Sequence, residues 1–436
     1  MPKLFKFDAI NGFQAFVVLR FSFAILTSIA MAKSGISLSE IGIYEALMLI
    51  GASFTFFWMT GLLHGVLSVY PNLSESEKPK LIFNIFTLFI VLSTSVSFLM
   101  WIFSDSITTG MTNFEYLPHF HWLCIWLAIN LPTFLIEYVY ILQNRPKWMV
   151  FFGLYSFLGQ FLVVIIPIFL GWSLEISFIG LVILAATKFV WLLFILKNNS
   201  TINWNFQRLQ PYWLIALPIV LYTFIGGVMN YVDGVIIMKY YNEEQFAIYR
   251  NGAREFPIAL ALINAMSAAL IPNISEHLPS GLGQIKHRTR NLMYPLFGAS
   301  ILLMLVSEWA YPIVFSADFA ESAFVFNVYL LALISRILLP QTILIGLKKT
   351  KTILTASVLE ISLNLGLSIL LIRDFGLVGV AIATVIAFSV EKVFMILYNH
   401  YRLNISLKDY LDIPRFLICS LLLLASYGGV FFFLST

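Results

Sequence analysis

Apolar residues in this chain are collected in about thirteen runs of roughly 20 residues, separated by short polar segments. A helical run of that length crosses about 30 Å of hydrocarbon, at about 1.5 Å of rise per residue. Each span must be helical, because lipid offers the backbone no hydrogen-bond partner. The pattern predicts an all-α polytopic membrane protein with spans near 13–33, 41–70, 81–104, 119–142, 148–172, 176–196, 212–238, 245–271, 291–315, 322–347, 352–372, 375–398 and 415–434.

Composition agrees with this class. Hydrophobic residues make up 60% of the chain and charged residues 11%, whereas soluble domains carry roughly 25% charged residues. The two cysteines, Cys124 and Cys419, fall inside apolar spans and indicate neither a disulfide nor a metal site. The net charge of +4 forms no basic surface suited to nucleic acid.

The basic residues predict the orientation. With a cytoplasmic N-terminus, 17 of the 26 lysines and arginines fall on the inside, three fall outside and six lie within spans. This bias towards the inside is typical of membrane proteins. An odd number of spans then places the C-terminus outside.

Short sequence echoes predict an internal duplication. "PNLSE" at 71–75 and "PNISE" at 272–276 both end an outside-to-inside span, and "FIGLVILAAT" at 178–187 resembles "FGLVGVAIAT" at 375–384. We expect two six-helix bundles of parallel orientation, 1–200 and 201–400. Residues 401–436 would add an interfacial segment and one further transmembrane helix. Parallel repeats are typical of transporters, with the substrate between the halves.

Ionisable residues within the spans are candidates for function, because a charge at mid-helix is costly unless it is paired or faces water. Four of them lie near predicted span ends, where we expect them to reach the interface: Glu45, Glu308, Glu391 and Lys392. The other nine are Arg20, Glu137, Lys188, Asp233, Arg250, Arg254, Glu255, Arg336 and Glu360.

The arginines suggest an anionic ligand. Arg250 and Arg254 are four residues apart on the predicted eighth span, which would place them on one helical face, and Arg20 lies within the first span. Guanidinium groups donate paired hydrogen bonds to phosphate oxygens, so these residues are candidate substrate contacts. Lys188 and Arg336 are weaker candidates at mid-span. The alternative is ion pairing within a bundle, for example of Arg20 or Arg254 with Glu45 or Glu255.

A second set of polar residues suggests ion coupling, since no nucleotide-binding motif is present. Glu360, Asn364 and Ser368 follow at four-residue spacing on the eleventh span, and Asp233 and Thr384 lie on the seventh and twelfth. Oxygen ligands with one carboxylate suit Na⁺. Proton coupling through Asp233 or Glu360 and simple helix–helix hydrogen bonding remain alternatives.

The stretches "NYVDGVIIMKYYNEEQFAIYRNGAREFP" (230–257) and "LEISLNLGLSILLIRDFGLVGVAIATVIAF" (359–388) resemble the O-antigen and lipid-linked oligosaccharide flippases. These belong to the multidrug/oligosaccharidyl-lipid/polysaccharide exporter superfamily. The resemblance covers about residues 10–400. It implies a V-shaped transporter fold that turns a polyprenyl-diphosphate-linked glycan from the cytoplasmic to the outer leaflet by alternating access, for lipopolysaccharide and other cell-surface polysaccharide. It also implies a bacterial cytoplasmic (inner) membrane location.

The resemblance also implies site residues. In the related lipid II flippases, arginines of the first and eighth helices face the cavity, and Arg20, Arg250 and Arg254 fall on the matching helices. Sodium-binding members use an acid on helix seven, Asn and a second acid on helix eleven, and a carbonyl and Thr on helix twelve. The matching positions are Asp233, Asn364, Ser368, Val380 and Thr384, with Ser368 in place of the second acid.

Three classes of function are thus considered: a glycan-lipid flippase, a cation-coupled multidrug exporter of the same superfamily, and a membrane enzyme such as a glycan polymerase. The longest external loop, 105–118, carries two acids and no Lys, Arg or His, which argues against the enzyme. We expect no catalytic residues and no cofactor other than Na⁺ or H⁺ as coupling ion. The expected partners are the glycan lipid, membrane lipids and other polysaccharide assembly proteins, with no nucleotide and no nucleic acid.

Overall fold

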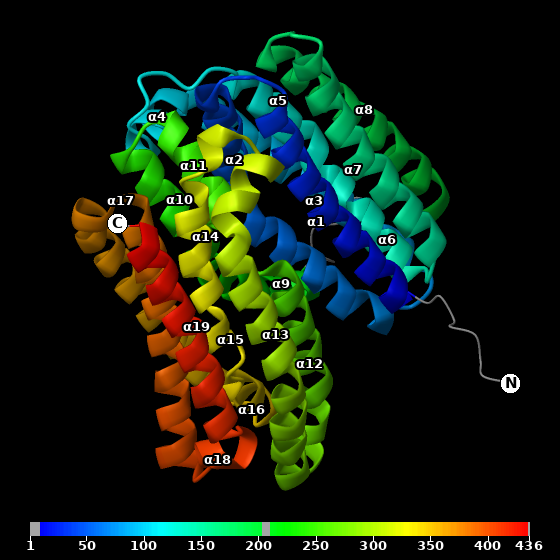
Figure 1. Ribbon diagram of the computed structural model, residues 1–436. Helices are drawn as coiled ribbons and strands as arrows, with labels where there is room; N and C mark the ends of the chain where they lie inside the picture. Colours follow the sequence, from blue (N-terminus) through cyan, green and yellow to red (C-terminus); the bar gives the residue numbers. More distant parts are fainter. Residues whose placement is uncertain (1–8, 203–209, 435–436) are drawn as a thin grey trace, which may run out of the picture. The chain divides into compact units, whose positions relative to one another are not determined.

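The computed structural model describes residues 9–202 and 210–434, and every regular element in these ranges is a helix (Figure 1). The chain forms two compact units. Unit 1 comprises residues 1–231 and 238–244, and unit 2 comprises residues 232–237 and 245–436. The long apolar helices confirm the prediction of an all-α polytopic membrane protein.

Unit 1 contains the first set of helices along the chain. Their bounds are α1 (Ala9–Lys33), α2 (Leu38–Val69), η1 (Tyr70–Asn72), α3 (Lys78–Ile102), α4 (Ser104–Met111), α5 (Phe120–Asn130), η2 (Leu131–Phe134), α6 (Leu135–Leu142), α7 (Pro146–Phe169), α8 (Leu174–Asn199) and α9 (Gln210–Gly227). The helix α10 (Met229–Tyr240) and the helix α11 (Glu243–Gly252) contribute to both units.

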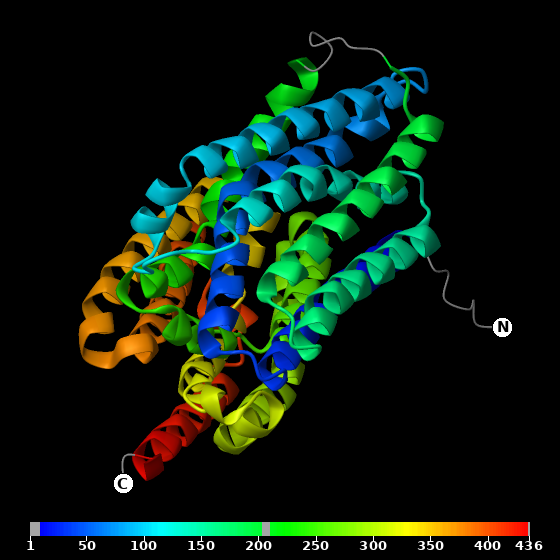
Figure 2. The same cartoon turned by 90° about the horizontal axis from the view of Figure 1, so that it is seen from above.

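Close helix packing in unit 1 depends on small residues. A Cβ atom added to Gly61 of α2 would lie 2.5 Å from the Cα atom of Val220 in α9, so only glycine allows the two backbones to approach this closely. At the next residue of α2, the Leu62 carbonyl accepts a 2.7 Å hydrogen bond from the Tyr212 hydroxyl of α9. Elsewhere in the unit, α1 packs along α7, and α7 along α8 (Figure 1, Figure 2).

Unit 2 contains α12 (Pro257–Glu276), α13 (Leu278–Val314), η4 (Ala317–Phe319), α14 (Ser322–Leu331), α15 (Leu333–Arg336), α16 (Pro340–Gly346), α17 (Thr350–Leu403), α18 (Leu407–Tyr410) and α19 (Ile413–Leu434). Its apolar core is formed mainly by buried side chains of α12 and α13, together with side chains of the segment 330–343, and α19 packs on α13. The basic segment 286–290, which we expected before a span, lies inside the 37-residue helix α13.

The helix α17 reverses direction within its length. Gly376 has φ 58° and ψ −138°, a conformation that is essentially restricted to glycine. Asn364 and Thr384 are 20 residues apart, or about 30 Å along a straight helix, yet their side chains are joined by a 2.9 Å hydrogen bond. The arms 350–375 and 377–403 therefore form a helical hairpin, as the two predicted spans 352–372 and 375–398 require.

The described helices can be matched to the thirteen predicted spans by length and composition. Ten helices among the described residues are long and apolar enough to cross a membrane, and two pairs bent by 49° and 46° bring the number to twelve. The hairpin in α17 divides one of these and gives thirteen. The predicted seventh span bends at Val228, and the predicted eighth span is interrupted between α11 and α12.

The two compact units do not coincide with the residue ranges of the expected repeats. The helix α9, expected to open the second repeat, packs along α2 in unit 1. A unit defined by contacts and a repeat defined by duplication are different properties, so the repeats at 1–200 and 201–400 stay a prediction.

Candidate functional site

Unit 1 encloses a cavity of about 440 Å³ among α1, α2, α5, α6, α7 and α8. Most of its lining is aromatic or aliphatic, including Phe16, Trp126 and Phe134. Two cations that the sequence singled out, Arg20 and Lys188, both line it. Electrostatic interactions with a charged ligand are stronger in such a cavity than in water, because its apolar walls have a low dielectric constant.

Arg20 reaches the cavity from α1 and forms an ion pair with Glu137 of α6. Its Nη2 atom donates a 2.9 Å hydrogen bond to Oε2 of Glu137. The Arg20 side chain remains 39% exposed, whereas the Glu137 side chain is 5% exposed. The guanidinium carbon also lies 5.1–5.8 Å from the ring centres of Phe16, Phe134 and Phe157. Arg20 is thus held in place and still has one accessible face.

Lys188 approaches the same cavity from α8. The side chain is buried, and Nζ donates a hydrogen bond to Oδ1 of Asn130 at the end of α5. The cavity therefore holds two basic side chains and the carboxylate of Glu137. Arg20 thus has the ion pair within a bundle that was the alternative to a substrate contact. Its partner is Glu137 and neither of the suggested examples, Glu45 and Glu255, because the pairing depends on which helix packs beside α1 and not on the distance along the chain.

A local break in the predicted fourth span shapes this part of the cavity. Pro132 lacks an N–H group and cannot donate to the carbonyl of Ala128, so the chain passes through the 3₁₀ segment η2 before α6 begins. Ser93 of α3 donates a 3.1 Å hydrogen bond to the carbonyl thus released. The break places Asn130 and Glu137 on the cavity wall.

In unit 2, Arg250 and Arg254 do not share a helical face, which corrects the prediction. The helix α11 ends at Gly252, and Arg254 lies in the non-helical residues 253–256 before Pro257 begins α12. A residue close before proline is disfavoured in helical conformation, and Gly252 ends the helix readily. The Arg254 side chain donates a 3.1 Å hydrogen bond to Oδ1 of Asn251.

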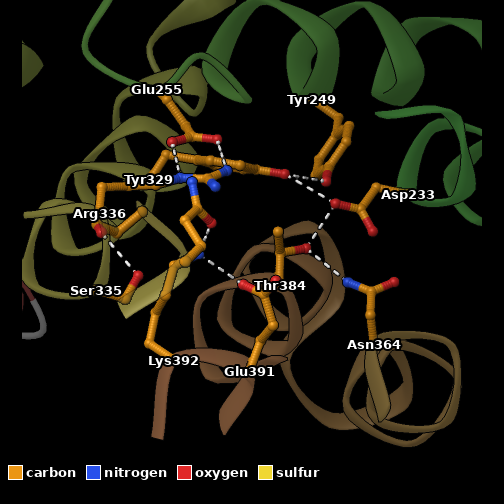
Figure 3. Close-up of polar contacts among 12 residues, drawn as sticks. Asp233, Tyr249, Glu255, Tyr329, Ser335, Arg336, Asn364, Thr384, Glu391 and Lys392 are labelled. Atoms are coloured by element: carbon orange, nitrogen blue, oxygen red, sulfur yellow. Dashed lines mark hydrogen bonds and ion pairs between the residues drawn. The ribbon is translucent and has the colours of Figure 1, made fainter. Parts of the chain in front are cut away.

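The same break directs Glu255 towards Arg336. Arg336 donates two hydrogen bonds to the Glu255 carboxylate, 2.8 Å from Nε and 2.6 Å from Nη2, in the bidentate geometry typical of strong ion pairs (Figure 3). The guanidinium carbon lies 3.8 Å from the ring centre of Phe388. Arg336 therefore has the structural pairing that was the alternative to a substrate contact.

Glu391 and Lys392 are buried, although we expected them at the membrane interface. Lys392 Nζ donates hydrogen bonds to Glu391 Oε2 at 2.8 Å and to Gln341 Oε1 at 2.7 Å. The prediction was wrong because the helix continues to Leu403, so both residues lie well inside it, and α16 packs against this helix. Glu360 on the other arm of α17 is 9% exposed, so this part of unit 2 contains several buried charges.

Asp233 of α10 is the centre of a separate polar cluster in unit 2 (Figure 3). Its Oδ2 atom accepts hydrogen bonds from Thr384 Oγ1 at 2.5 Å and from the Tyr329 hydroxyl at 3.0 Å. The Tyr249 hydroxyl lies 3.0 Å from that of Tyr329, and Asn364 donates to Thr384. The four residues predicted from the sequence, Asp233, Asn364, Ser368 and Thr384, are all buried.

This cluster meets the requirements of a small hard cation. Three buried oxygen atoms have no hydrogen-bond partner: Asp233 Oδ1, Asn364 Oδ1 and Ser368 Oγ. Unpaired buried oxygens are costly, and a cation that accepts oxygen ligands would satisfy them. In the part of the chain that the structure describes, no three His, Cys, Asp or Glu side chains come together as they do in transition-metal sites. The residues present therefore fit Na⁺.

Comparison with known proteins identifies the family. The family model described as lipid II flippase MurJ matches residues 61–435, most of the chain. This chain belongs to the MurJ family.

Individual relatives agree with the assignment to the MurJ family. The chain is 26% identical over 188 residues to a Haloferax volcanii protein described as probable low-salt glycan biosynthesis flippase Agl15; the match covers 41% of this chain and 39% of that protein. The structure of a lipid II flippase MurJ in an inward closed conformation has a TM-score of 0.74 at 17% identity, covering 97% of this chain and 92% of that one.

Structures of multidrug transporters share the fold more distantly. A multidrug resistance MATE family transporter in an inward-facing conformation has a TM-score of 0.64 at 11% identity, covering 89% of this chain and 98% of that one. The Vibrio cholerae MATE transporter VcmN has a TM-score of 0.59 at 12% identity, covering 91% and 97%. The MurJ-family chain described here thus has the transporter fold of this superfamily, as its sequence predicted.

Proposed function

We propose that this protein is a flippase that moves a polyprenyl-diphosphate-linked oligosaccharide from the cytoplasmic to the outer leaflet for cell-surface polysaccharide synthesis. It works by alternating access and not as an enzyme, in the inner membrane of a bacterium, with its N-terminus in the cytoplasm. Membership of the MurJ family supports the flippase activity, and the match to a glycan biosynthesis flippase supports a glycan lipid as substrate. Other polysaccharide assembly proteins are its expected partners.

The cavity of unit 1 is the observation that carries this proposal. Arg20 and Lys188 are two cations in a pocket walled by aromatic rings. The guanidinium of Arg20 can form paired hydrogen bonds with phosphate oxygens, and Lys188 adds a second positive charge. The rings suit the apolar isoprenoid beside the diphosphate. Arg250 and Arg254 stay candidates for contacts with the same substrate, whereas the bidentate bond to Glu255 favours a structural role for Arg336.

The first experiment reconstitutes the full chain in liposomes with a fluorescent polyprenyl-diphosphate oligosaccharide and measures its leaflet exchange. We expect Arg20→Ala to slow exchange at least about tenfold, a loss of about 1.4 kcal/mol of stabilisation. Arg20→Ala leaves the Glu137 carboxylate without its partner, and the double variant Arg20→Ala, Glu137→Gln removes that charge. Leaflet exchange should remain slow in the double variant, because the guanidinium is still missing. Arg415→Ala, at an exposed pair, is the matched control. Unchanged exchange in both Arg20 variants would contradict the proposed binding site.

For coupling, we propose that Asp233, Asn364, Thr384 and the Val380 carbonyl hold Na⁺, with Ser368 as a further oxygen ligand. The bound ion would neutralise the negative charge of the buried Asp233 carboxylate. Sodium chloride should raise the thermal midpoint of the purified protein more than potassium chloride does, and Asp233→Asn should abolish the difference. A thermal midpoint that changes with pH and not with the Na⁺ concentration would favour proton coupling through Asp233 or Glu360.

A cation-coupled multidrug exporter is the second candidate. The likeness to MATE transporters supports it, as does a carboxylate among aromatic rings in the cavity of unit 1. The excess of basic side chains in that cavity argues against a cationic substrate. Efflux of a cationic dye from the same liposomes, without exchange of the glycan lipid, would favour the exporter.

A further inference from the structure

The charges of the unit 1 cavity do not balance when the cavity holds no ligand. Arg20 and Lys188 contribute two positive charges, and Glu137 contributes one negative charge. A sugar-linked diphosphate carries two negative charges. If it entered with Glu137 ionised, one negative charge would remain uncompensated in an apolar environment of low dielectric constant, which is unfavourable. Protonation of Glu137 would bring the total to zero.

The geometry allows the diphosphate and Glu137 to compete for one partner. The carboxylate accepts the hydrogen bond from Arg20 at 2.9 Å and is almost fully buried, whereas Arg20 is exposed enough to be reached from the cavity. A phosphate group offers two oxygens that can accept paired hydrogen bonds, as a carboxylate does. A ligand that engages the guanidinium therefore competes with Glu137 for its hydrogen bonds.

The titratable groups around Glu137 are few. Arg20 faces it from α1, and Lys188 acts on it from α8. On α6 its neighbour is Tyr138, whose ring lies 6.3 Å from that of His64 in α2. The helix α7 lines the cavity with the neutral side chains of Ser156 and Gln160 as well as aromatic rings. A carboxylate that loses Arg20 has only Lys188 as a compensating cation, and Lys188 is also required by the diphosphate.

We propose that Glu137 is a displaceable counter-ion of Arg20, and that the diphosphate of the substrate replaces it while Glu137 takes up one proton from water. This inference rests on the proposed flippase function and links substrate binding to the uptake of one proton. No covalent bond changes: the proton moves from solvent to a Glu137 oxygen when the lipid binds, and it returns when the lipid leaves. Substrate binding is thereby linked to pH, independently of any ion at Asp233.

The test measures binding of the sugar-linked fluorescent diphosphate to the full chain in nanodiscs between about pH 6 and pH 9, where the probe's own phosphate charges do not titrate. One linked proton makes the wild-type affinity fall up to about tenfold per pH unit in the alkaline range. Glu137→Gln should depend on pH less steeply than the wild type, by the one proton that Glu137 contributes, and should bind no more weakly than the wild type at the alkaline end. The buried amine of Lys188 lines the same cavity and is the other group whose titration changes the affinity there. Glu137→Asp should keep the dependence.

Glu175→Gln is the matched control, since the Glu175 carboxylate accepts a 3.0 Å hydrogen bond from the Trp122 indole and does not line the cavity. It should behave like the wild type. A pH dependence that is as steep in Glu137→Gln as in the wild type overturns the inference, as does loss of binding in that variant at an unchanged thermal midpoint.

A second measurement avoids any folding defect of the variants. Binding to the wild type in weak buffer should take up close to one proton per probe, followed with a pH-indicator dye. Binding without proton uptake overturns the inference and leaves the flippase proposal standing. A wild type that binds no diphosphate lipid at any pH overturns the proposed function itself.

Discussion

Replacing Arg336 by Met is expected to destabilise unit 2 strongly, because it leaves the Glu255 carboxylate without its two hydrogen bonds. Those bonds measure 2.8 and 2.6 Å, and the side chains of Arg336 and Glu255 are only 27% and 17% exposed. Met has a stem of similar length, so packing against Phe388 is largely kept while the charge is lost.

The expected loss is about 3 kcal/mol. Breaking a buried ion pair by removing one partner costs about 3–5 kcal/mol. The residual exposure of both side chains places this pair at the lower end, since water can partly solvate the remaining charge. Glu255→Gln keeps one acceptor oxygen and should cost less, about 1–2 kcal/mol. The double variant should then be more stable than the sum of the single losses predicts, by about 2 kcal/mol.

Equilibrium unfolding in mixed detergent micelles, followed by circular dichroism, measures these four free energies. The control is Arg415→Met in the same unit. Its pair with Asp412 has a single contact of 3.4 Å and is 40% and 20% exposed, so the loss should stay below about 1 kcal/mol. The reasoning is refuted if Arg336→Met loses no more stability than this control. It is also refuted if the coupling energy between Arg336 and Glu255 is below about 0.5 kcal/mol, because the ion pair then does not join the segment 253–256 to α15.

Three further substitutions test other parts of the structure. Gly376→Ala should lower the free energy of unfolding by at least about 2 kcal/mol, because an alanine is strained in this backbone conformation. The control is Gly366→Ala, in open space on the same helix, which should leave the thermal midpoint unchanged or raise it. Equal effects of the two substitutions would contradict the hairpin. Gly61→Ala should lower the free energy of unfolding by about 1–3 kcal/mol, because the added methyl group clashes with α9. The control is Gly226→Ala, where the methyl group meets no neighbour. A Gly61→Ala variant as stable as the wild type would disprove the close approach of α2 and α9. Ser368→Asp adds a carboxylate among the unpartnered oxygens and should lower the Na⁺ concentration needed for half-maximal stabilisation; no change there would argue against Na⁺ at this site.

The sequence alone indicated the approximate positions of the membrane helices, because the length of an apolar run is a local property that the thickness of the bilayer selects. It also determined that Glu360, Asn364 and Ser368 share a face, since helical periodicity fixes the direction of side chains four residues apart. Pro132 and Pro257 lie where helices break, and Gly376 lies where α17 turns, so local backbone chemistry is visible at these positions of the sequence.

Only the tertiary structure decided which charges meet. Arg20 and Glu137 are 117 residues apart, and Arg336 and Glu255 are 81 apart, so neither pairing follows from any local pattern. Glu391 and Lys392 were expected at the interface because the end of a hydrophobic run is a poor guide to where a helix ends. Burial and pairing depend on which helices pack together, and many weak contacts across the whole unit determine that packing. The local sequence could therefore name the charged residues of this protein, and the packing of its helices decided their partners.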